Sequence, residues 1–312
     1  MADVSVIIPS HNVRHYIGPC LESILAQTEP VREVIVVDDS SDGSGELIQA
    51  YARSSKGLIR LVEVEHVPDS QSRNRNIGLA HAAGSLIAYL DADDLWMPEK
   101  IAKQVAVLDA HPEAVASHSG LFFFRESLDD EGRRGWDRIA DDPTVADIIL
   151  MQAVPASTVL VRREALEDVA FDESSGHGED TIWAASLRLK GRWRLAEGPL
   201  TARRLHDTQV TRSIWHGIYH SETRARWVRE HAEQIGEDVA AEIEDRIGRQ
   251  VIEMLERQYW NRQLDDLPAL CERARRSFPD HFARSTLAHR RIWPRWVYAI
   301  ADRLKGRGRD QR

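Results

Sequence analysis

Two continuous apolar runs near the start of the chain constrain the fold more than any other feature. Residues 4–9 (VSVIIP) and 33–37 (EVIVV) read as strands that are apolar on both faces, as in a parallel sheet covered by helices. Segments with helical spacing of apolar residues separate them from further strand-like runs at 58–65 and 85–90. This alternation predicts an α/β fold with a mostly parallel, Rossmann-like sheet flanked by helices.

Carboxylates follow two of the predicted strands at the point where each strand ends. Asp38 and Asp39 follow the second strand, and Asp91, Asp93 and Asp94 follow the fourth. Ligands of open α/β sheets bind in the crevice outside the carboxyl ends of the strands, so we expect Asp39 to be functional and Asp38 to hold the following turn. Alternate carboxylates at a strand tip can bind Mg²⁺ or Mn²⁺, and such an ion neutralises a diphosphate leaving group. Without the strand context, a solvated turn explains these three acids better.

A second pair of acids, Glu179 and Asp180, lies at the start of a predicted helix. The helix dipole and capping explain acids at this position without any function. The alternative is a general base that removes a proton from an acceptor hydroxyl. The spacing leaves both interpretations open. A helix is also expected over residues 75–83, with Gly84 at its C-terminal cap.

The chain changes character after residue 210. Val239, Ile243, Ile247, Val251 and Leu255 recur at four-residue steps, which predicts a helix with one buried face. We therefore expect a catalytic domain over 1–210 and a helical appendage over 211–312. Trp227 and Trp260 are expected to pack this appendage onto the catalytic domain.

Composition narrows the function classes. The chain has 50 Asp+Glu against 41 Lys+Arg, a net charge of -9, which argues against nucleic acid as a partner. Two cysteines exclude a disulfide framework and indicate an intracellular, cytoplasmic protein. No apolar run is long enough for a membrane span, and the N-terminus shows no secretory signal.

The C-terminal segment 284–312 carries a net positive charge, unlike the chain as a whole. Residues 284–312 contain nine basic and two acidic side chains, with Trp293, Trp296 and Tyr298 interleaved among them. This mixture suits the anionic surface of a membrane, so we expect peripheral association through 284–312 at the inner membrane face. A packed or solvated tail is the alternative, since Pro294 interrupts any long amphipathic helix.

Eight short motifs, in order and at matching spacing over about residues 3–210, resemble family 2 glycosyltransferases of the GT-A fold. They are VSVIIPSHN at 4–12, VVDDSSDGS at 36–44, RNIG at 75–78, AYLDADD at 88–94, STVLVRR at 157–163, FDE at 171–173, GED at 178–180 and RLH at 204–206. The resemblance implies transfer of a sugar from a nucleotide diphosphate sugar, in particular a UDP-sugar, to a saccharide or lipid-linked acceptor hydroxyl. It also implies inversion at the anomeric carbon, dependence on Mn²⁺ or Mg²⁺, and surface-polysaccharide or glycoconjugate assembly as the setting.

The resemblance also implies roles at the donor site. Pro9 and His11 lie where the family grips the nucleoside, and His11 replaces the aromatic residue that usually stacks on uracil. Asp39 would bind the base, Arg75 the base or diphosphate, and Asp91 the ribose or sugar.

The metal and the reacting hydroxyl involve other residues. Asp93 would be the metal ligand, and His206 matches a position that approaches the metal or diphosphate in some members of the family. For His206, a structural histidine at a sheet edge is an equal alternative. Asp180 would be the catalytic base, with Glu179 beside it.

Three other function classes compete with this one. A nucleotide-sugar-binding module without turnover would be expected to lack some of Asp39, Asp91, Asp93 and Asp180, all of which are present. A dinucleotide oxidoreductase needs G-x-G-x-x-G after the first strand, where PSHNVR stands instead. A nucleotidyltransferase would carry a loop rich in glycine and in arginine or lysine at the same place, and the sequence has no such loop there.

Overall fold

The computed structural model describes the chain except for residues 129–134, 137–139, 152–153, 207–213, 262 and 291–312. The contacts divide the chain into two compact units, Met1–Gln209 and Val210–Arg312, and each is described by itself. The described helices include none that is both long and apolar enough to cross a membrane. The tail for which membrane association is expected falls mostly within 291–312, outside the described residues.

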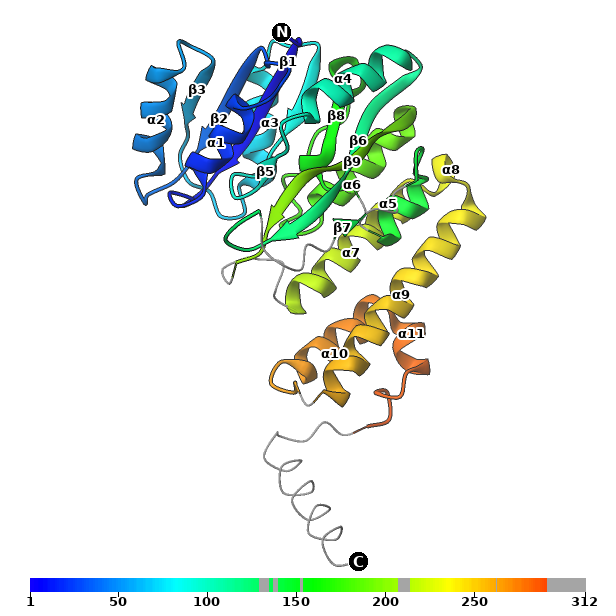
Figure 1. The fold of residues 1–312 in the computed structure, drawn as a ribbon. Coiled ribbons are helices and arrows are strands. Elements are labelled where there is room, and N and C mark those ends of the chain that lie inside the picture. The colour runs from blue at the N-terminus through cyan, green and yellow to red at the C-terminus, as the bar shows by residue number, and fades with distance from the viewer. Residues whose placement is uncertain (129–134, 137–139, 152–153, 207–213, 262, 291–312) are drawn as a thin grey trace, which may run out of the picture. The chain divides into compact units, whose positions relative to one another are not determined.

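The first unit is built on a nine-stranded sheet with the order β3-β2-β1-β4-β8-β6-β9-β5, and β7 pairs with β6. Strands β5, β7 and β8 run antiparallel to the others. The sheet is therefore mixed, with its parallel part at the N-terminal end of the order (Figure 1). The strands are β1 (Val4–Ser10), β2 (Glu33–Asp38), β3 (Ile59–Glu63), β4 (Leu86–Tyr89), β5 (Leu95–Trp96), β6 (Ala114–Phe124), β7 (Gly135–Trp136), β8 (Val159–Arg162) and β9 (Arg192–Arg204).

Helices cover both faces of this sheet. Residues of α1, α2 and α4 share a hydrophobic core with the alternate β1 residues Val4, Val6 and Ile8. On the other face, α3 packs on β1 and β2, and Tyr89 of β4 meets Trp183 of α6 edge to face. The helices are α1 (Ile17–Leu25), α2 (Ser44–Ser54), α3 (Gln71–His81), α4 (Lys100–Ala110), α5 (Val145–Met151) and α6 (Glu179–Lys190), with 3₁₀ turns η1 (Ala156–Thr158) and η2 (Arg163–Leu166).

This arrangement confirms the predicted α/β fold, and β1 shows why the prediction worked. Every residue of β1 is buried, because helices lie on both sides of it. Gly78 lets α3 approach closely, since a Cβ there would come within 2.3 Å of Ile7 Cγ2.

Helix α3 departs from its predicted bounds. It begins at Gln71 rather than at residue 75. The prediction missed its first turn because the buried side chains there are polar (Ser72, Asn74, Arg75) and give no hydrophobic periodicity. Gly84 does not cap it, and Ala82 is the C-cap instead. A Cβ at Gly84 would lie 2.7 Å from the carbonyl oxygen of Asp3, so close backbone approach explains this glycine.

The second unit is helical. Helix α9 buries the expected stripe, from Ile243 through Ile247, Val251 and Leu255. Val239 is exposed, however, and Ala240 takes its place on the buried face. The helices are α7 (Ile214–Glu230), α8 (Ala232–Ile235), α9 (Glu237–Trp260), α10 (Leu267–Ser277) and α11 (Pro279–Arg284).

Trp227 and Trp260, the two tryptophans expected to pack the appendage onto the catalytic domain, differ in exposure. Trp227 is buried in α7. Trp260 is 56% exposed at the end of α9. Its ring lies 5.0 Å from the guanidinium of Arg290, a cation–π contact.

Candidate active site

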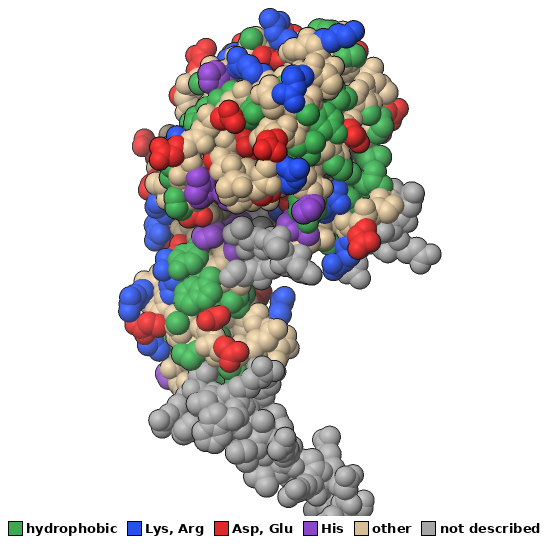
Figure 2. Space-filling model, turned by 90° about the vertical axis from the view of Figure 1, so that its left-hand side faces the viewer, with side chains coloured by type: hydrophobic (Ala, Val, Ile, Leu, Met, Phe, Trp, Pro, Cys, Tyr) green, Lys and Arg blue, Asp and Glu red, His purple; other side chains and the backbone are tan. Residues whose placement is uncertain are grey.

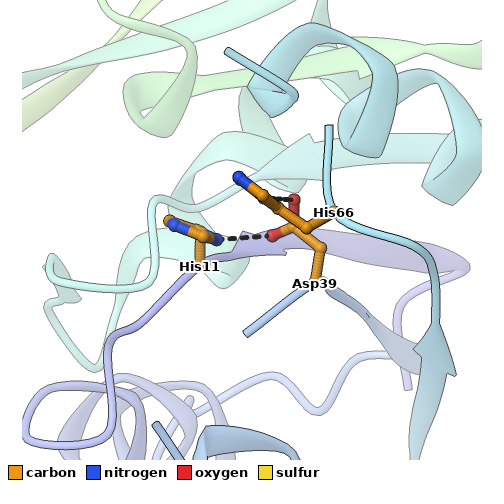
Figure 3. A group of neighbouring side chains, drawn as sticks. All are labelled: His11, Asp39 and His66. Atoms are coloured by element: carbon orange, nitrogen blue, oxygen red, sulfur yellow. Dashed lines mark hydrogen bonds and ion pairs between the residues drawn. The ribbon is translucent and has the colours of Figure 1, made fainter. Parts of the chain in front are cut away.

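The first polar group at the carboxyl end of the sheet surrounds Asp39, directly after β2. Both carboxylate oxygens are engaged: Oδ1 lies 3.0 Å from His11 Nδ1, and Oδ2 lies 3.0 Å from His66 Nδ1 and accepts the Ser70 hydroxyl at 2.5 Å. The two imidazole rings stack at 4.5 Å, and both turn a nitrogen toward the same carboxylate (Figure 3). We call His11, Asp39, His66 and Ser70 the Asp39 cluster.

Hydrogen bonding dominates the electrostatics of this cluster. Burial raises the pKa of Asp39, but the hydrogen bonds from Ser70 and His66 outweigh it and leave the pKa below its ordinary value. The side chain of Asp39 has no exposed surface, whereas His11 and His66 are about half exposed. The imidazoles, rather than the carboxylate, therefore face solvent. Neighbouring Asp38 accepts the hydroxyls of Ser10 and Ser40, both at 2.6 Å.

The second polar group forms after β4. The Arg75 guanidinium donates to Asp91 Oδ1 at 2.8 Å and to Glu179 Oε1 at 3.2 Å, so it joins the end of β4 to the start of α6. Arg75 itself is only 3% exposed and lies 5.0 Å from the Phe171 ring. We call Asp91, Asp93, Asp94 and Glu179 the Asp91 cluster.

The two carboxylates that contact Arg75 have pKa values shifted in opposite directions. Burial raises the pKa of Asp91, but the Arg75 charge leaves it below its ordinary value. Burial and then the charge of Asp180 raise the pKa of Glu179, and Arg75 offsets only part of this. Since neither Asp91 nor Glu179 could hold its charge well without Arg75, the guanidinium is the internal counter-ion of this region.

Asp93 meets His206 across the end of the sheet. Asp93 Oδ2 lies 2.9 Å from His206 Nε2, and both side chains are partly exposed. The His206 ring stacks on Tyr16 at 4.9 Å. Arg204 donates through Nε to the Asp93 carbonyl at 3.1 Å, which fixes the loop that carries this carboxylate.

Asp94 lies behind this pair and accepts the backbone N–H of Arg204 at 3.0 Å. Burial, followed by repulsion from Asp93 and Asp91, raises its pKa well above the ordinary value. Sequence reasoning missed Arg203: burial lowers its pKa, but Asp94, Asp91, Asp180 and Asp93 together raise it above the ordinary value. The signal was the adjacent Arg203-Arg204 pair at the end of β9.

Most of the expected site residues thus belong to the Asp39 cluster or lie in and beside the Asp91 cluster, and one lies inside a strand. Asp39 and His11 are together, as are Arg75 and Asp91, while Asp93 pairs with His206. Pro9 is buried within β1, paired with Val37. Asp180, in the first turn of α6, helps to raise the pKa of Arg75 and of Arg203.

This arrangement suits a polyanionic ligand only with a cation present. Asp93 and His206 offer a carboxylate and an imidazole with exposed surface, and Mg²⁺ or Mn²⁺ needs few protein ligands when phosphates and water supply the others. Across the face drawn in Figure 2, acidic, basic and histidine side chains are interspersed among the described residues, so charge of one sign does not cover this face.

Residues 5–170 match the model of the family described as glycosyl transferase family 2. The chain belongs to this family. The putative teichuronic acid biosynthesis glycosyltransferase TuaG of Bacillus subtilis is 38% identical over 190 residues, which cover 59% of this chain and 72% of TuaG. The chain spans about half of the first curated relative that it matches (52%) and a fifth of another (20%), so whole-protein activities do not transfer directly.

Solved structures show the same fold. TarS 1–349 of S. aureus in complex with UDP-GlcNAc has a TM-score of 0.63 at 18% identity, over 90% of this chain and 89% of that one. The mannosyltransferase PcManGT of Pyrobaculum calidifontis, in complex with GDP-Man and Mn²⁺, has a TM-score of 0.54 at 21% identity, over 82% and 74%. The expected GT-A fold is therefore confirmed.

Proposed function

We propose that the chain transfers a sugar from a UDP-sugar to a hydroxyl of a saccharide or lipid-linked acceptor, with inversion, in the assembly of a surface polysaccharide or glycoconjugate. The observation that carries this proposal is the cluster of acids at one end of the sheet. Arg75 joins Asp91 to Glu179 at the start of α6, and His206 pairs with Asp93. The TuaG and TarS likenesses support the setting and the donor.

The donor would lie along the carboxyl edge of the sheet. Its nucleoside would meet His11 and the Asp39 cluster, next to Pro9, and its ribose or sugar would meet Asp91. Arg75 is too buried for wide contact with the diphosphate, so we assign it the role of holding Asp91 and Glu179 in place. Catalysis is assigned to residues 1–210, within which the whole family match falls.

Asp93 and His206 would hold a Mn²⁺ or Mg²⁺ ion. When bound, such an ion would neutralise charge that develops on the leaving diphosphate. The two side chains are in contact, partly exposed and of suitable chemistry, and the neighbour PcManGT is described with Mn²⁺. Arg203, whose positive charge is sustained by four acids, would add a fixed positive charge to the same region.

Asp180 would act as the general base. It would take the proton of the acceptor hydroxyl while the hydroxyl oxygen bonds to the anomeric carbon and the bond from that carbon to the diphosphate breaks. A single displacement of this kind inverts the anomeric centre. Glu179 is the less suitable base because its carboxylate already accepts from Arg75.

Release of nucleoside diphosphate from UDP-, GDP- and dTDP-sugars, with Mn²⁺ or Mg²⁺, tests this proposal. The wild type should release UDP from a UDP-sugar only with metal, and Asp93→Ala should abolish release. Asp109→Ala removes an exposed carboxylate in α4 and serves as the matched control, with activity unchanged.

No release and no nucleotide binding would contradict the assignment of the donor site. Binding without release, even with added acceptors, would favour a nucleotide-sugar-binding module without turnover.

A further inference from the structure

Three metal-ligand groups converge in the Asp39 cluster from three different loops. His11 follows β1, Asp39 follows β2 and His66 follows β3, and one ligand atom from each lies within 4.8 Å of the other two. Figure 3 shows both imidazoles turned toward the carboxylate between them. We propose that His11, Asp39 and His66 bind a divalent transition metal ion such as Zn²⁺, at a site separate from Asp93 and His206.

The three ligand atoms lie close enough for one ion to draw them together. Zn–N and Zn–O bonds of about 2.0–2.2 Å place neighbouring ligand atoms of a tetrahedral site about 3.3 Å apart. The ligand atoms lie within 4.8 Å of one another, and each Nδ1 lies 3.0 Å from a different Asp39 oxygen, so the two stacked rings must turn toward a shared point for an ion to enter. Three protein ligands leave a fourth position for water or a solute.

The surroundings favour this ion over Mg²⁺. Two imidazoles and one carboxylate suit Zn²⁺, Co²⁺ or Ni²⁺, whereas Mg²⁺ takes oxygen ligands. Asp39 is fully buried and is oriented by the Ser70 hydroxyl, as outer hydrogen bonds orient metal ligands in general. The histidines are 40% and 50% exposed, which gives an ion access from solvent.

Coordination requires each imidazole to free its Nδ1. A neutral ring does this by moving its proton to Nε2, without net release of a proton. At His11, Nε2 lies 2.9 Å from Asn12 Nδ2, and Asn12 Oδ1 accepts the backbone N–H of Ser41. Both Asn12 and Ser41 are exposed, so the amide can turn its oxygen to the new N–H while water replaces the Ser41 contact.

Binding of Co²⁺ to the full chain tests the site, because four-coordinate Co²⁺ with imidazole ligands absorbs strongly in the visible range. The wild type should show this band, and Zn²⁺ should displace it. His66→Asn should lose the band or weaken Co²⁺ binding at least ~10-fold. His66 is exposed, so the variant should fold normally, and His11→Asn provides a second ligand removal.

Two controls separate the site from other histidines and acids. His15→Asn changes an exposed histidine four residues from His11 and should keep the band. Asp93→Ala removes the other ion-binding carboxylate and should also keep it. A wild type without the band, or a band that survives His66→Asn and His11→Asn, would overturn the proposal.

One consequence rests on the proposed function. If the nucleoside meets His11 and Asp39, Zn²⁺ and UDP compete, and calorimetry should show weaker UDP binding with Zn²⁺ in the wild type than in His66→Asn. The cobalt spectrum needs no nucleotide. A band together with UDP binding that Zn²⁺ leaves unchanged would therefore keep the metal site and reject only the overlap with the nucleoside.

Discussion

The two polar clusters at the carboxyl edge of the sheet hold negative charge in different ways. Asp39 is a single carboxylate that accepts from two imidazoles and a hydroxyl. The Asp91 cluster gathers four carboxylates, with Arg75 as an internal counter-ion and one member, Asp94, strongly disposed to keep its proton. The first cluster is saturated with donors, whereas in the second the carboxylates lie close enough to repel one another, with Arg75 and Arg203 among them.

This difference separates two tasks. A carboxylate whose acceptors are filled by donors fixes the orientation of those donors, so His11 and His66 present defined ring edges to a ligand. A cluster in which several carboxylates repel one another favours a cation, because like charges at close range are costly until one is neutralised. The comparison predicts that damage to one cluster has different effects from damage to the other.

The largest effect is expected at the edge of the Asp91 cluster. Asp180→Asn should lower the transfer rate by about 10²–10⁴-fold, the usual contribution of a general base, with donor binding retained. Glu179→Gln keeps an oxygen for Arg75 and should cost less. Steady-state kinetics paired with UDP calorimetry checks both variants, and a greater loss in Glu179→Gln would transfer the role of base to Glu179.

Arg75→Met is expected to have the second largest effect. The substitution leaves Asp91 and Glu179 without their buried counter-ion, and breaking such a pair costs about 3–5 kcal/mol. Urea unfolding of the variant and of Arg53→Met, an exposed arginine in α2, measures the difference. A loss equal to that of the control would contradict the counter-ion role.

A crossed pair of variants sharpens the comparison. Asp39→Asn should weaken UDP binding in the absence of metal by about 10-fold, because an imidazole that meets the nucleoside loses its hydrogen bond to a charged group and its fixed orientation, and it should leave Mn²⁺ binding unchanged. Asp93→Ala should do the reverse. Calorimetry with each ligand alone checks the pattern, and the two clusters would not be independent if both variants lost both ligands.

The smallest effects concern pH, and their signs differ. The lowered pKa of Asp39 adds stability that is complete above the unfolded value near 3.8 and disappears as pH falls through the folded pKa. The raised pKa of Asp94 removes stability as pH rises from 3.8 toward its folded pKa.

Asp39→Asn should therefore destabilise at pH 7 more than at pH 3. Asp94→Asn should stabilise the fold at pH 7 and have a smaller effect at pH 3, where the carboxyl group is protonated in both the folded and the unfolded state. Unfolding curves between pH 3 and pH 7 give the change in unfolding free energy for each variant. Two variants whose changes at pH 7 have the same sign would contradict the comparison.

The sequence predicted the parallel part of the sheet because burial on both faces leaves a continuous apolar run, as in β1. It predicted the placement of Asp39 and Asp91 for a related reason, since they follow such runs directly. Helix α3 was misplaced at its start because its buried face is polar, and periodicity detects only apolar faces.

The pairings within the site were not predictable in the same way. His66 follows β3 with no motif around it, and only the alignment of β1, β2 and β3 brings it to Asp39. Arg75 was expected to face the donor, and its burial between Asp91 and Glu179 depends on α6, which lies about a hundred residues further along the chain. Long-range contacts of this kind leave no local signal.

The pair of Asp93 and His206 joins positions 113 residues apart, and the segment directly after β9 supplies the second partner. During synthesis, a chain that ends before β9 already contains β1–β4 and the acids that follow them, yet it lacks His206 and both arginines of the strand end. The Asp93–His206 pair therefore cannot assemble until nearly the whole first unit has left the ribosome. An incomplete chain would hold Asp93 and Asp94 without Arg203, Arg204 and His206 beside them, so under the proposed function it would lack the pair assigned to the metal.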